Sequence, residues 1–260
     1  MKRFLNKTIV VTGGATGIGA ACARRFAEEG GNIISVDINE TENEKILSEC
    51  EKRFGIKTRS YIRDSRDEAG AQEIISEVIA DFGNVDVLVC SAGIYEGGPI
   101  PAVTMERWRE VLDINLTGTF LYNQAVIPVM MDRKGGSIIN ISSMAGKTSW
   151  PASAEYSSSK SGVIGLTRSV AMELAPFGAT ANALCPGNTL TEMVRNVSKV
   201  VGKREGMTGE EWLQMRANDC PMKRLAEPWE MAGIIAFLAS DDARYITGQS
   251  ISADGGMVLS

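Results

Sequence analysis

Short apolar runs rich in valine and isoleucine alternate along the chain with longer stretches that carry apolar residues at helical spacing. The short runs predict buried strands at residues 8–11, 32–37, 57–62, 85–90, 136–141, 179–185 and 250–253. The longer stretches predict helices at 20–29, 40–54, 67–82, 104–132, 154–177 and 228–240. Strands and helices that alternate in this way form a parallel sheet with helices on both faces. We therefore expect one α/β domain over residues 1–260, built on a doubly wound parallel sheet, with no linker or repeat that divides it.

The region from residue 188 to residue 228 is the exception, because its pattern is irregular. It contains helical pieces around 193–201 and 210–220, and we expect it to form a substrate loop. Its large apolar side chains either pack over a substrate or form the buried face of these small helices, and the pattern favours neither. These side chains are Met193, Met207, Trp212, Met215 and Met222.

Composition narrows the class of protein. With 44% hydrophobic residues the chain can bury a large core, and no apolar run reaches the length of a membrane span. A net charge of -5 argues against a nucleic-acid binder. The five scattered cysteines favour reduced thiols in the cytoplasm, and we expect no signal peptide. There is no histidine, so acid–base chemistry must use Tyr, Lys, Asp, Glu or Cys, and histidine-rich zinc sites are excluded.

A glycine-rich turn follows the first predicted strand and has the sequence Thr12-Gly13-Gly14-Ala15-Thr16-Gly17-Ile18-Gly19. It lies between a strand and a helix, which is the context that a dinucleotide-binding turn requires. Glycines let the backbone turn tightly and approach a pyrophosphate, whose charge is stabilised by the helix N-terminus. The alternative is a plain strand-to-helix turn, and no Gly-Lys-Ser/Thr sequence follows that would indicate a P-loop.

Asp37 ends the second predicted strand, about 20 residues beyond the glycines, where the dinucleotide pattern places a carboxylate. A carboxylate there accepts hydrogen bonds from the adenosine ribose hydroxyls and repels a 2′-phosphate. No Arg or Lys occupies the glycine turn or the two positions after Asp37. This pattern favours NAD over NADP, although a solvated strand end would give the same residue.

Tyr156 and Lys160 lie four residues apart and therefore share one face of the predicted helix. An ammonium near a phenol stabilises the phenolate and lowers the pKa of the tyrosine, which is about 10 in the free side chain. The pair could exchange protons with a substrate, whereas the alternative is a solvated helix face. Asn115 inside a predicted helix indicates a specific role or a kink, and the hydroxyl of Ser143 after the fifth strand could orient a substrate oxygen.

Together these motifs resemble those of the short-chain dehydrogenase/reductase family over essentially the whole chain. They are Thr12-Gly13-x-x-x-Gly17-Ile18-Gly19, Asn115, Ser143, Tyr156-x-x-x-Lys160 and Pro186-Gly187, in the family's order and at its usual spacing. The resemblance implies a Rossmann-type fold and hydride transfer between NAD and a secondary alcohol or ketone. It implies that Tyr156 is the general acid/base, that Lys160 lowers its pKa and holds the nicotinamide ribose, and that Ser143 binds the reacting oxygen. Asn115 would break its helix locally and position a water for a proton relay through Lys160, and no metal is implied.

The resemblance also implies which residues line the two sites. The cofactor would contact Gly13, Thr16, Gly17, Ile18, Gly19, Asp37, Asp64, Ser91, Ala92, Gly93, Tyr156, Lys160, Pro186, Gly187, Thr189 and Thr191. The substrate would contact Ser143, Ala145, Trp150, Tyr156, Asn188 and Met193. One position departs from the family pattern, which usually has Asn-Asn-Ala-Gly after the fourth strand, where this chain has Cys90-Ser91-Ala92-Gly93. Because serine has less reach than asparagine, we expect weaker support of the central sheet or of the cofactor pocket.

Within the family, short segments of the sequence most resemble those of the polyol, sugar and acetoin/diol dehydrogenases. The polar Asn188 favours a hydroxylated substrate. One alternative is a 3-oxoacyl-thioester reductase, a branch that normally prefers NADPH, so Asp37 counts against it. The other is a nucleotide-sensing protein without catalysis, against which the intact Asn115, Ser143, Tyr156 and Lys160 argue.

The resemblance further implies a homo-oligomer, a homotetramer or a dimer. From composition we expect a cytoplasmic protein with no nucleic-acid or membrane partner. The expected interface uses the helices that carry Asn115 and Tyr156. Its apolar residues would be Leu116, Phe120, Val163, Val170 and Met172.

Overall fold

The computed structural model describes residues 2–148 and 150–259. Its strands form one sheet, in which every neighbouring pair is parallel, in the order β3-β2-β1-β4-β5-β6-β7. The strands are β1 (Thr8–Thr12), β2 (Asn32–Asp37), β3 (Thr58–Ile62), β4 (Val87–Cys90), β5 (Ser137–Ile141), β6 (Thr180–Pro186) and β7 (Ser250–Ala253). The predicted fold class is confirmed, and each strand lies within two residues of its predicted ends.

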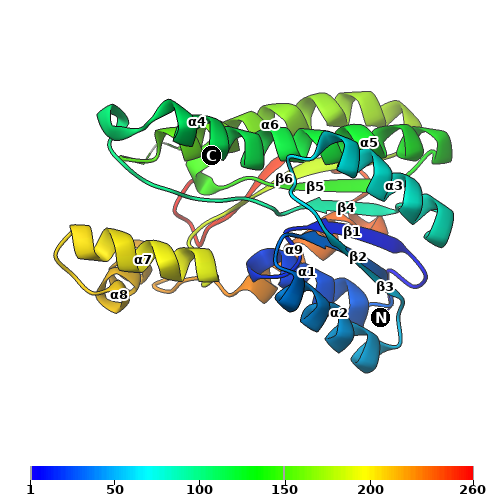
Figure 1. Cartoon of the computed structure of the whole chain (residues 1–260), viewed down its shortest axis with the longest axis horizontal. Helices are drawn as coiled ribbons and strands as arrows, with labels where there is room; N and C mark the ends of the chain where they lie inside the picture. The colour runs from blue at the N-terminus through cyan, green and yellow to red at the C-terminus, as the bar shows by residue number, and fades with distance from the viewer. Residues whose placement is uncertain (1, 149, 260) are drawn as a thin grey trace.

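Two helical layers cover the sheet (Figure 1). One layer consists of α1 (Gly17–Glu28), α2 (Glu40–Phe54) and α9 (Pro228–Leu238). The other consists of α3 (Glu68–Phe82), α4 (Met105–Leu112), α5 (Gly118–Arg133) and α6 (Ala154–Leu174). Consecutive residues of a strand point to opposite faces, so Val11 joins the core under α1 while Val10 joins the core under α5 and α6. This is why the strands are apolar on both faces and lack alternation.

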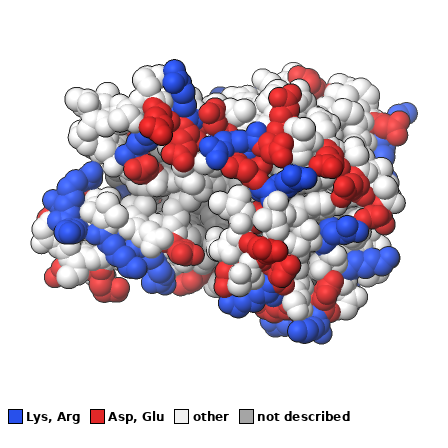
Figure 2. All heavy atoms as spheres, viewed as in Figure 1, with Lys and Arg blue, Asp and Glu red and all other residues white. Residues whose placement is uncertain are grey.

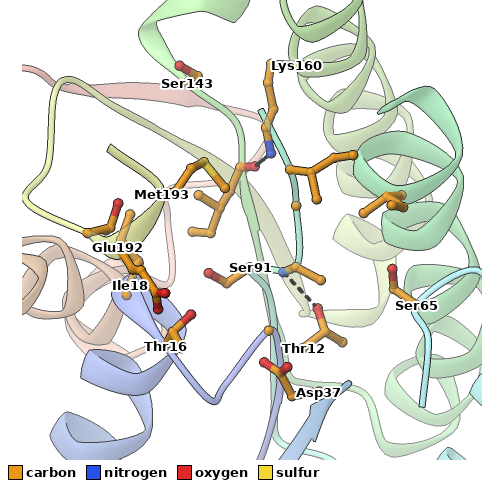
Figure 3. Close-up of a pocket in the computed structure, with 18 of the residues that line it drawn as sticks. Thr12, Thr16, Ile18, Asp37, Ser65, Ser91, Ser143, Lys160, Glu192 and Met193 are labelled. Carbon is orange, nitrogen blue, oxygen red and sulfur yellow. Dashed lines mark hydrogen bonds between the residues drawn. The ribbon is translucent and has the colours of Figure 1, made fainter. Parts of the chain in front are cut away.

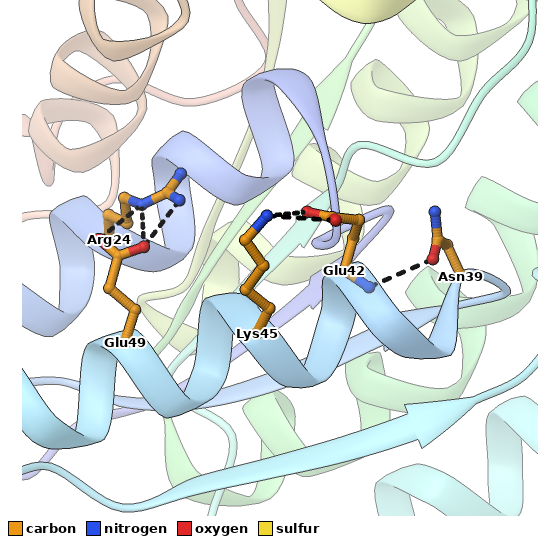
Figure 4. Close-up of polar contacts among 5 residues, drawn as sticks. All are labelled: Arg24, Asn39, Glu42, Lys45 and Glu49. Atoms are coloured by element: carbon orange, nitrogen blue, oxygen red, sulfur yellow. Dashed lines mark hydrogen bonds and ion pairs between the residues drawn. The ribbon is translucent and has the colours of Figure 1, made fainter.

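An ion pair joins α2 to α1 (Figure 4). Arg24 of α1 forms an ion pair with Glu49 of α2, with 2.8 Å between Arg24 Nη2 and Glu49 Oε2. Asn39 caps α2 by accepting a hydrogen bond from the Glu42 backbone N–H at 3.2 Å. With this cap, α2 starts at Glu40, three residues after the end of β2.

The single helix predicted over 104–132 is interrupted. α4 ends at Leu112, a π-helical turn spans Asp113–Thr117, and α5 follows. The extra residue of a π turn rotates the helix register, which frees Asn115 for contacts outside the helix. Asn115 therefore lies in a local interruption of the α-helix.

Among the predicted helices of the sheet layers, three ends differ from the prediction by two residues or more. α1 begins at Gly17 rather than residue 20, because Ala20 N–H already donates to Thr16 O at 3.0 Å. α6 ends at Leu174, and residues Ala175–Phe177 form a 3₁₀ turn, since Pro176 cannot donate a backbone hydrogen bond. α9 ends at Leu238, two residues early.

α7 (Glu192–Arg204) and α8 (Gly209–Asp219) form a pair that stands beyond the end of the sheet, at the left of Figure 1. Trp212, Met207 and Met215 pack in a small core between them. Met193 and Met222 remain outside this core, with 36% and 60% of their surface exposed. Trp212, Met207 and Met215 therefore form the buried face of the small helices, whereas Met193 and Met222 do not belong to it.

Two residues predicted to lie on an intersubunit face are not at the surface. Val163 and Val170 are buried, because their side of α6 packs on the sheet, so that prediction was wrong for both. Phe120 and Met172 are exposed, and Leu116 is partly buried beside Gly162. Within the described residues, every helix is too short or too polar to cross a membrane.

Candidate functional site

A cleft opens where the strand order reverses, between the C-terminal ends of β1 and β4. Ligands of open α/β sheets bind at such a point. The cleft has a volume of about 470 Å³ and is lined by the ends of β1, β2, β4, β5 and β6 and by the starts of α1 and α7. From outside it is a hollow between the α7–α8 pair and the body of the domain, with both signs of charge on its rim (Figure 2). Inside, Ser143 and Lys160 lie at one end and Asp37 at the other (Figure 3).

The glycine turn brings backbone close to backbone at the middle of the cleft. Gly13 has φ +68°, and a Cβ on it would lie 2.7 Å from Ala92 Cα, so a larger residue does not fit. Gly17 opens α1, whose first turn contains no acidic residue. The helix N-terminus therefore offers N–H groups and a positive dipole end to an anion. Thr16, Gly17 and Ile18 line the cleft with Gly13, whereas Gly19 packs against Gly13 O and supports the turn from behind.

Asp37 joins the end of β2 to this turn. Its Oδ2 accepts a hydrogen bond from Ala15 N–H at 3.0 Å, and its Oδ1 accepts one from Asn39 N–H at 2.9 Å. The carboxylate lines the cleft, as the sequence predicts for a ribose ligand.

Two arginines that the sequence search missed line the same end of the cleft, Arg63 and Arg66. The Arg66 guanidinium donates hydrogen bonds to the Asp64 carboxylate, with 2.6 Å between Arg66 Nη2 and Asp64 Oδ2. These hydrogen bonds hold the pKa of Asp64 below its ordinary value. Arg63 pairs with Glu73 at 3.1 Å. Both were missed because only positions near the glycines and Asp37 were considered, while β3 pairs with β2 and brings its own C-terminal loop to the same place. The strand order of a doubly wound sheet is the signal that would have found them.

The departure at Cys90-Ser91 leaves the centre of the sheet with a polar network. Asn123 Nδ2 donates to Asn140 Oδ1 at 2.9 Å and to Cys90 Sγ at 3.4 Å. Asn140 Nδ2 donates in turn to Thr167 Oγ1 at 3.0 Å. Burial raises the pKa of the Cys90 thiol to about 12, so it accepts as a neutral group. Asparagines of α5 and β5 thus form a buried hydrogen-bond network beside Cys90.

Tyr156, Ser143 and Lys160 converge at the other end of the cleft. Lys160 Nζ donates to Ile141 O at 2.9 Å and lies 5.8 Å from the centroid of the Tyr156 ring. Burial lowers the pKa of Lys160 to about 8. Burial also raises the pKa of Tyr156 above its ordinary value, although a hydrogen bond with Ser143 opposes this. The net direction is opposite to the expected lowering by Lys160, because desolvation of the phenolate outweighs an ammonium directed at a carbonyl.

Asn115 fixes the backbone that follows β4. Its Oδ1 accepts from Ile94 N–H at 2.8 Å, and its Nδ2 donates to Ile94 O at 3.0 Å and to Ser159 Oγ at 3.1 Å. A Cβ on Gly93 would lie 3.1 Å from Asn115 Oδ1 and 3.4 Å from Lys160 Nζ. Both polar groups therefore face the same narrow space beside Gly93.

The predicted cofactor residues other than Gly19 all line the cleft. Of the predicted substrate residues, Ser143, Tyr156 and Met193 line it, whereas Ala145, Trp150 and Asn188 lie elsewhere. Trp150 stacks against the Arg216 guanidinium of α8, 4.7 Å from its ring centroid. Asn188 lines a second cavity of about 280 Å³, between α9 and the segments that lead into and out of the α7–α8 pair.

Other lining residues were not predicted: Thr12, Val36, Ile38, Ser65, Ile94, Glu110, Ile114, Ile141, Ser142, Glu192 and Val194. Within residues 2–148 and 150–259 there is no group of three His, Cys, Asp or Glu side chains that could hold a metal ion.

Comparison with known proteins agrees with this geometry. The family model described as Enoyl-(Acyl carrier protein) reductase matches residues 13–258. The 3-oxoacyl-[acyl-carrier-protein] reductase of Thermotoga maritima is 35% identical over 257 residues, which cover 99% of this chain and 100% of the relative. The structure of NAD⁺-bound xylitol dehydrogenase has a TM-score of 0.93 and 32% identity and covers 98% of this chain and 100% of that one. A variant of actinorhodin polyketide ketoreductase with NADPH has a TM-score of 0.94 and 32% identity and covers 98% of each chain.

The chain therefore belongs to the short-chain dehydrogenase/reductase family and is an oxidoreductase with a Rossmann-type fold. Solved relatives hold NAD⁺ in one case and NADPH in another, which leaves the choice between the two nicotinamide cofactors to this chain's own residues.

Proposed function

We propose that the protein is an NAD(H)-dependent oxidoreductase that interconverts a secondary alcohol and a ketone, with Tyr156 as general acid/base. The observation that carries the proposal is one continuous cleft with a glycine turn at its middle. Asp37 lies at one end and Tyr156, Ser143 and Lys160 lie at the other.

The residues of the cleft fit a nicotinamide dinucleotide. The gap between Gly13 and Ala92 is a cradle that a Cβ would fill, and the N-terminus of α1 beside it attracts an anion. This turn would hold the pyrophosphate, and Asp37 and Asp64 would hold the adenosine. The remaining contacts would come from Ser91, Ala92, Gly93, Tyr156, Lys160, Pro186, Gly187, Thr189 and Thr191. When bound, the nicotinamide supplies the hydride donor or acceptor.

The chain's own residues move the proton. For reduction, the Tyr156 phenol donates its proton to the ketone oxygen while the Ser143 hydroxyl donates a hydrogen bond to the same oxygen. For oxidation, the Tyr156 phenolate takes the alcohol proton. Because burial raises the pKa of Tyr156, the phenol is protonated at neutral pH. Reduction is therefore favoured near neutrality, and oxidation accelerates as the pH rises.

Lys160 and Asn115 would return the proton to solvent. Lys160, whose pKa burial lowers to about 8, is able to gain and lose a proton near neutral pH. Its Nζ and Asn115 Oδ1 face the same space beside Gly93, where a water would connect them.

A polyol, sugar or small diol is the substrate class that we propose. The similarity to xylitol dehydrogenase supports it, and the Asp37 carboxylate in the cleft supports NAD as the cofactor. A 3-oxoacyl-thioester reductase is the second candidate, since the Thermotoga maritima relative is 35% identical and is matched over its whole length.

Titration with NADH and then NADPH, followed by energy transfer from the tryptophans to the nicotinamide, tests the cofactor. We expect clearly tighter binding of NADH, and we expect an Asp37→Asn variant to lose that preference while an Asp132→Asn variant on the surface keeps it. Tighter NADPH binding by the unchanged protein would favour the 3-oxoacyl-thioester reductase over the proposed polyol, sugar or diol dehydrogenase. Binding of neither cofactor would point to the Cys90-Ser91 departure as the cause and reopen the alternative of a nucleotide-sensing protein without catalysis.

A Tyr156→Phe variant tests the chemistry. It should bind NADH as the unchanged protein does but reduce acetoin at least about 100-fold more slowly, since general acid–base catalysis contributes about 10²–10⁴-fold. Unchanged turnover of acetoin would disprove the assigned role of Tyr156.

We also propose that the protein is a cytoplasmic homo-oligomer. All five cysteines are buried free thiols, which supports a reducing compartment. The exposed Phe120 and Met172 support an interface through α5 and α6.

A further inference from the structure

Tyr95, five residues after the end of β4, touches the proposed acid/base directly. Its ring packs edge-on against that of Tyr156, with ring centroids 5.0 Å apart and planes inclined by 77°. Its hydroxyl lies 3.1 Å from the Oγ of Ser153, the N-cap residue of α6. Gly97 leaves space for that hydroxyl, because a Cβ there would lie 2.4 Å from the Tyr95 oxygen. Tyr95 is thus wedged between Tyr156 and the start of its helix.

An ion-pair bridge holds the neighbours of both tyrosines. Arg107 of α4 places Nη2 at 2.8 Å from Glu155 Oε1 and Nη1 at 3.0 Å from Glu96 Oε1. Glu155 is fully buried, and removing one partner of a buried pair is strongly destabilising, so this contact is persistent. Glu96 follows Tyr95 in the chain, and Glu155 precedes Tyr156. The ion-pair bridge and the ring contact therefore link the same two segments.

Backbone contacts fasten the same segment at both ends. Ile94 is held by Asn115 at one end, and Gly98 N–H donates to Ala152 O at 2.9 Å at the other. Ala152 has φ +56°, a left-handed conformation that residues other than glycine rarely adopt. Such strain persists only where surrounding contacts impose it. Residues 94–98 are therefore a constrained segment rather than a free loop.

We propose that Tyr95 is a positioning residue that fixes the ring of Tyr156 for proton transfer, and that the Glu96–Arg107–Glu155 bridge keeps Tyr95 against it. The inference rests on the proposed function, because it acts through Tyr156. A phenol on a helix rotates about two side-chain torsions, and an edge contact with a second ring restricts that rotation. Proton transfer needs donor and acceptor within hydrogen-bond reach, so restricting the phenol raises the rate.

The first test needs neither cofactor nor substrate. In ¹³C-tyrosine-labelled protein, NMR line shapes report how fast the Tyr156 ring flips. We expect faster flipping in Tyr95→Ala and nearly unchanged flipping in Tyr95→Phe, which keeps the ring contact. A Tyr245→Ala variant, which removes a fully exposed tyrosine, is the matched control and should leave the Tyr156 signal unchanged.

The second test measures acetoin reduction with NADH. Tyr95→Ala should lower kcat about 10- to 100-fold with an unchanged KM for NADH, the size that misplacement of a reacting group causes. Tyr95→Phe should recover most of the rate. The limb of the pH profile that reports Tyr156 should move to lower pH in Tyr95→Ala, because the phenol becomes better solvated and loses its neighbouring phenol.

A double variant tests the Glu96–Arg107–Glu155 bridge without leaving the buried Glu155 carboxylate unpaired. Arg107→Met combined with Glu155→Gln removes both partners of this ion pair together, and we expect about a tenfold loss of kcat and faster flipping of Tyr156. Arg244→Met, at an exposed surface pair, is the control.

The outcomes separate the two proposals. If Tyr156→Phe is inactive while Tyr95→Ala and the double variant match the unchanged protein in ring flipping and kcat, the positioning role is overturned and the function stands. Equal losses in Tyr95→Phe and Tyr95→Ala would overturn the ring contact as the cause. If Tyr156→Phe remains active, the proposed function itself fails.

Discussion

At the scale of single residues, the site keeps ionisable groups where burial opposes their charge. Lys160 is 5% exposed, and among the described residues its ammonium donates a hydrogen bond to Ile141 O. Burial lowers its pKa to about 8, which means that folding is penalised whenever the side chain is charged. A buried ammonium with one carbonyl partner is expected where function, rather than stability, selects the residue.

Lys160→Met should therefore stabilise the fold at neutral pH while impairing turnover. In unfolded chains the lysine pKa is near 10.4, so a folded value of about 8 corresponds to a cost of about 3 kcal/mol below pH 8. Losing the bond to Ile141 O offsets about 1 kcal/mol of that gain. We expect a net gain of about 1–2 kcal/mol in urea unfolding at pH 7.

The sign of the pH dependence follows from the lowered pKa. Between pH 8 and pH 10 the unfolded chain binds more protons at this residue than the folded one, so the unchanged protein gains stability as the pH rises. The advantage of Lys160→Met should shrink across that window and disappear near its upper limit. A variant that is no more stable at pH 7 than the unchanged protein would contradict the assigned burial cost.

At the scale of elements, contacts at several places hold the α7–α8 pair to the domain. The chain segments that enter and leave it are hydrogen-bonded to each other, with Leu190 N–H donating to Ala226 O at 2.8 Å. Cys220, which follows α8, places its Sγ 3.7 Å from Asp254 O. The Arg216 guanidinium lies 4.7 Å from the centroid of Trp150 and 5.8 Å from that of Trp212. Arg216 thereby joins α8 to the loop that precedes Tyr156. The α7–α8 pair is therefore fixed in place beside the cleft.

Arg216→Leu should loosen this unit and leave the sheet unaffected. A cation–π contact contributes about 0.5–2 kcal/mol, so amide hydrogen exchange in α8 should accelerate about 2- to 30-fold, while exchange in β5 and β6 stays the same. Arg204→Leu, at the exposed C-terminal end of α7, is the matched control. Equal exchange in α8 of the Arg216→Leu variant and the unchanged protein would show that the stack does not hold the pair.

At the scale of the whole molecule, the two helical layers bury most of their large apolar side chains, but some stay exposed, among them one on α5 and one on α6. Phe120 and Met172 lie on the outer side of α5 and α6 with 43% and 77% of their surface exposed. Exposed large apolar side chains on neighbouring helices are typical of an interface. Val163 and Val170 are absent from this face, so the interface that we propose is smaller than the sequence led us to expect.

A Phe120→Lys, Met172→Lys double variant should lower the molar mass measured by light scattering to that of a smaller assembly or a monomer. Like charges on both copies of a symmetric interface repel, and the apolar contact is lost. Ile62→Lys, an exposed apolar residue at the end of the edge strand β3, is the control and should keep the mass of the unchanged protein. A monomeric unchanged protein would contradict the proposal directly.

The sequence by itself determined the alternation of strands and helices, the glycine turn after β1, Asp37 at the end of β2 and the shared face of Tyr156 and Lys160. These follow from local spacing and backbone preferences, which residues close in the chain decide among themselves. Tertiary structure alone decided the rest: Arg63 and Arg66 at the Asp37 end of the cleft, the edge contact of Tyr95 with Tyr156, and Trp150 against α8. It also decided the burial of Val163 and Val170 and the direction of the Tyr156 pKa. Each of these depends on which distant segments meet and how much water they exclude, and neither quantity is contained in local spacing.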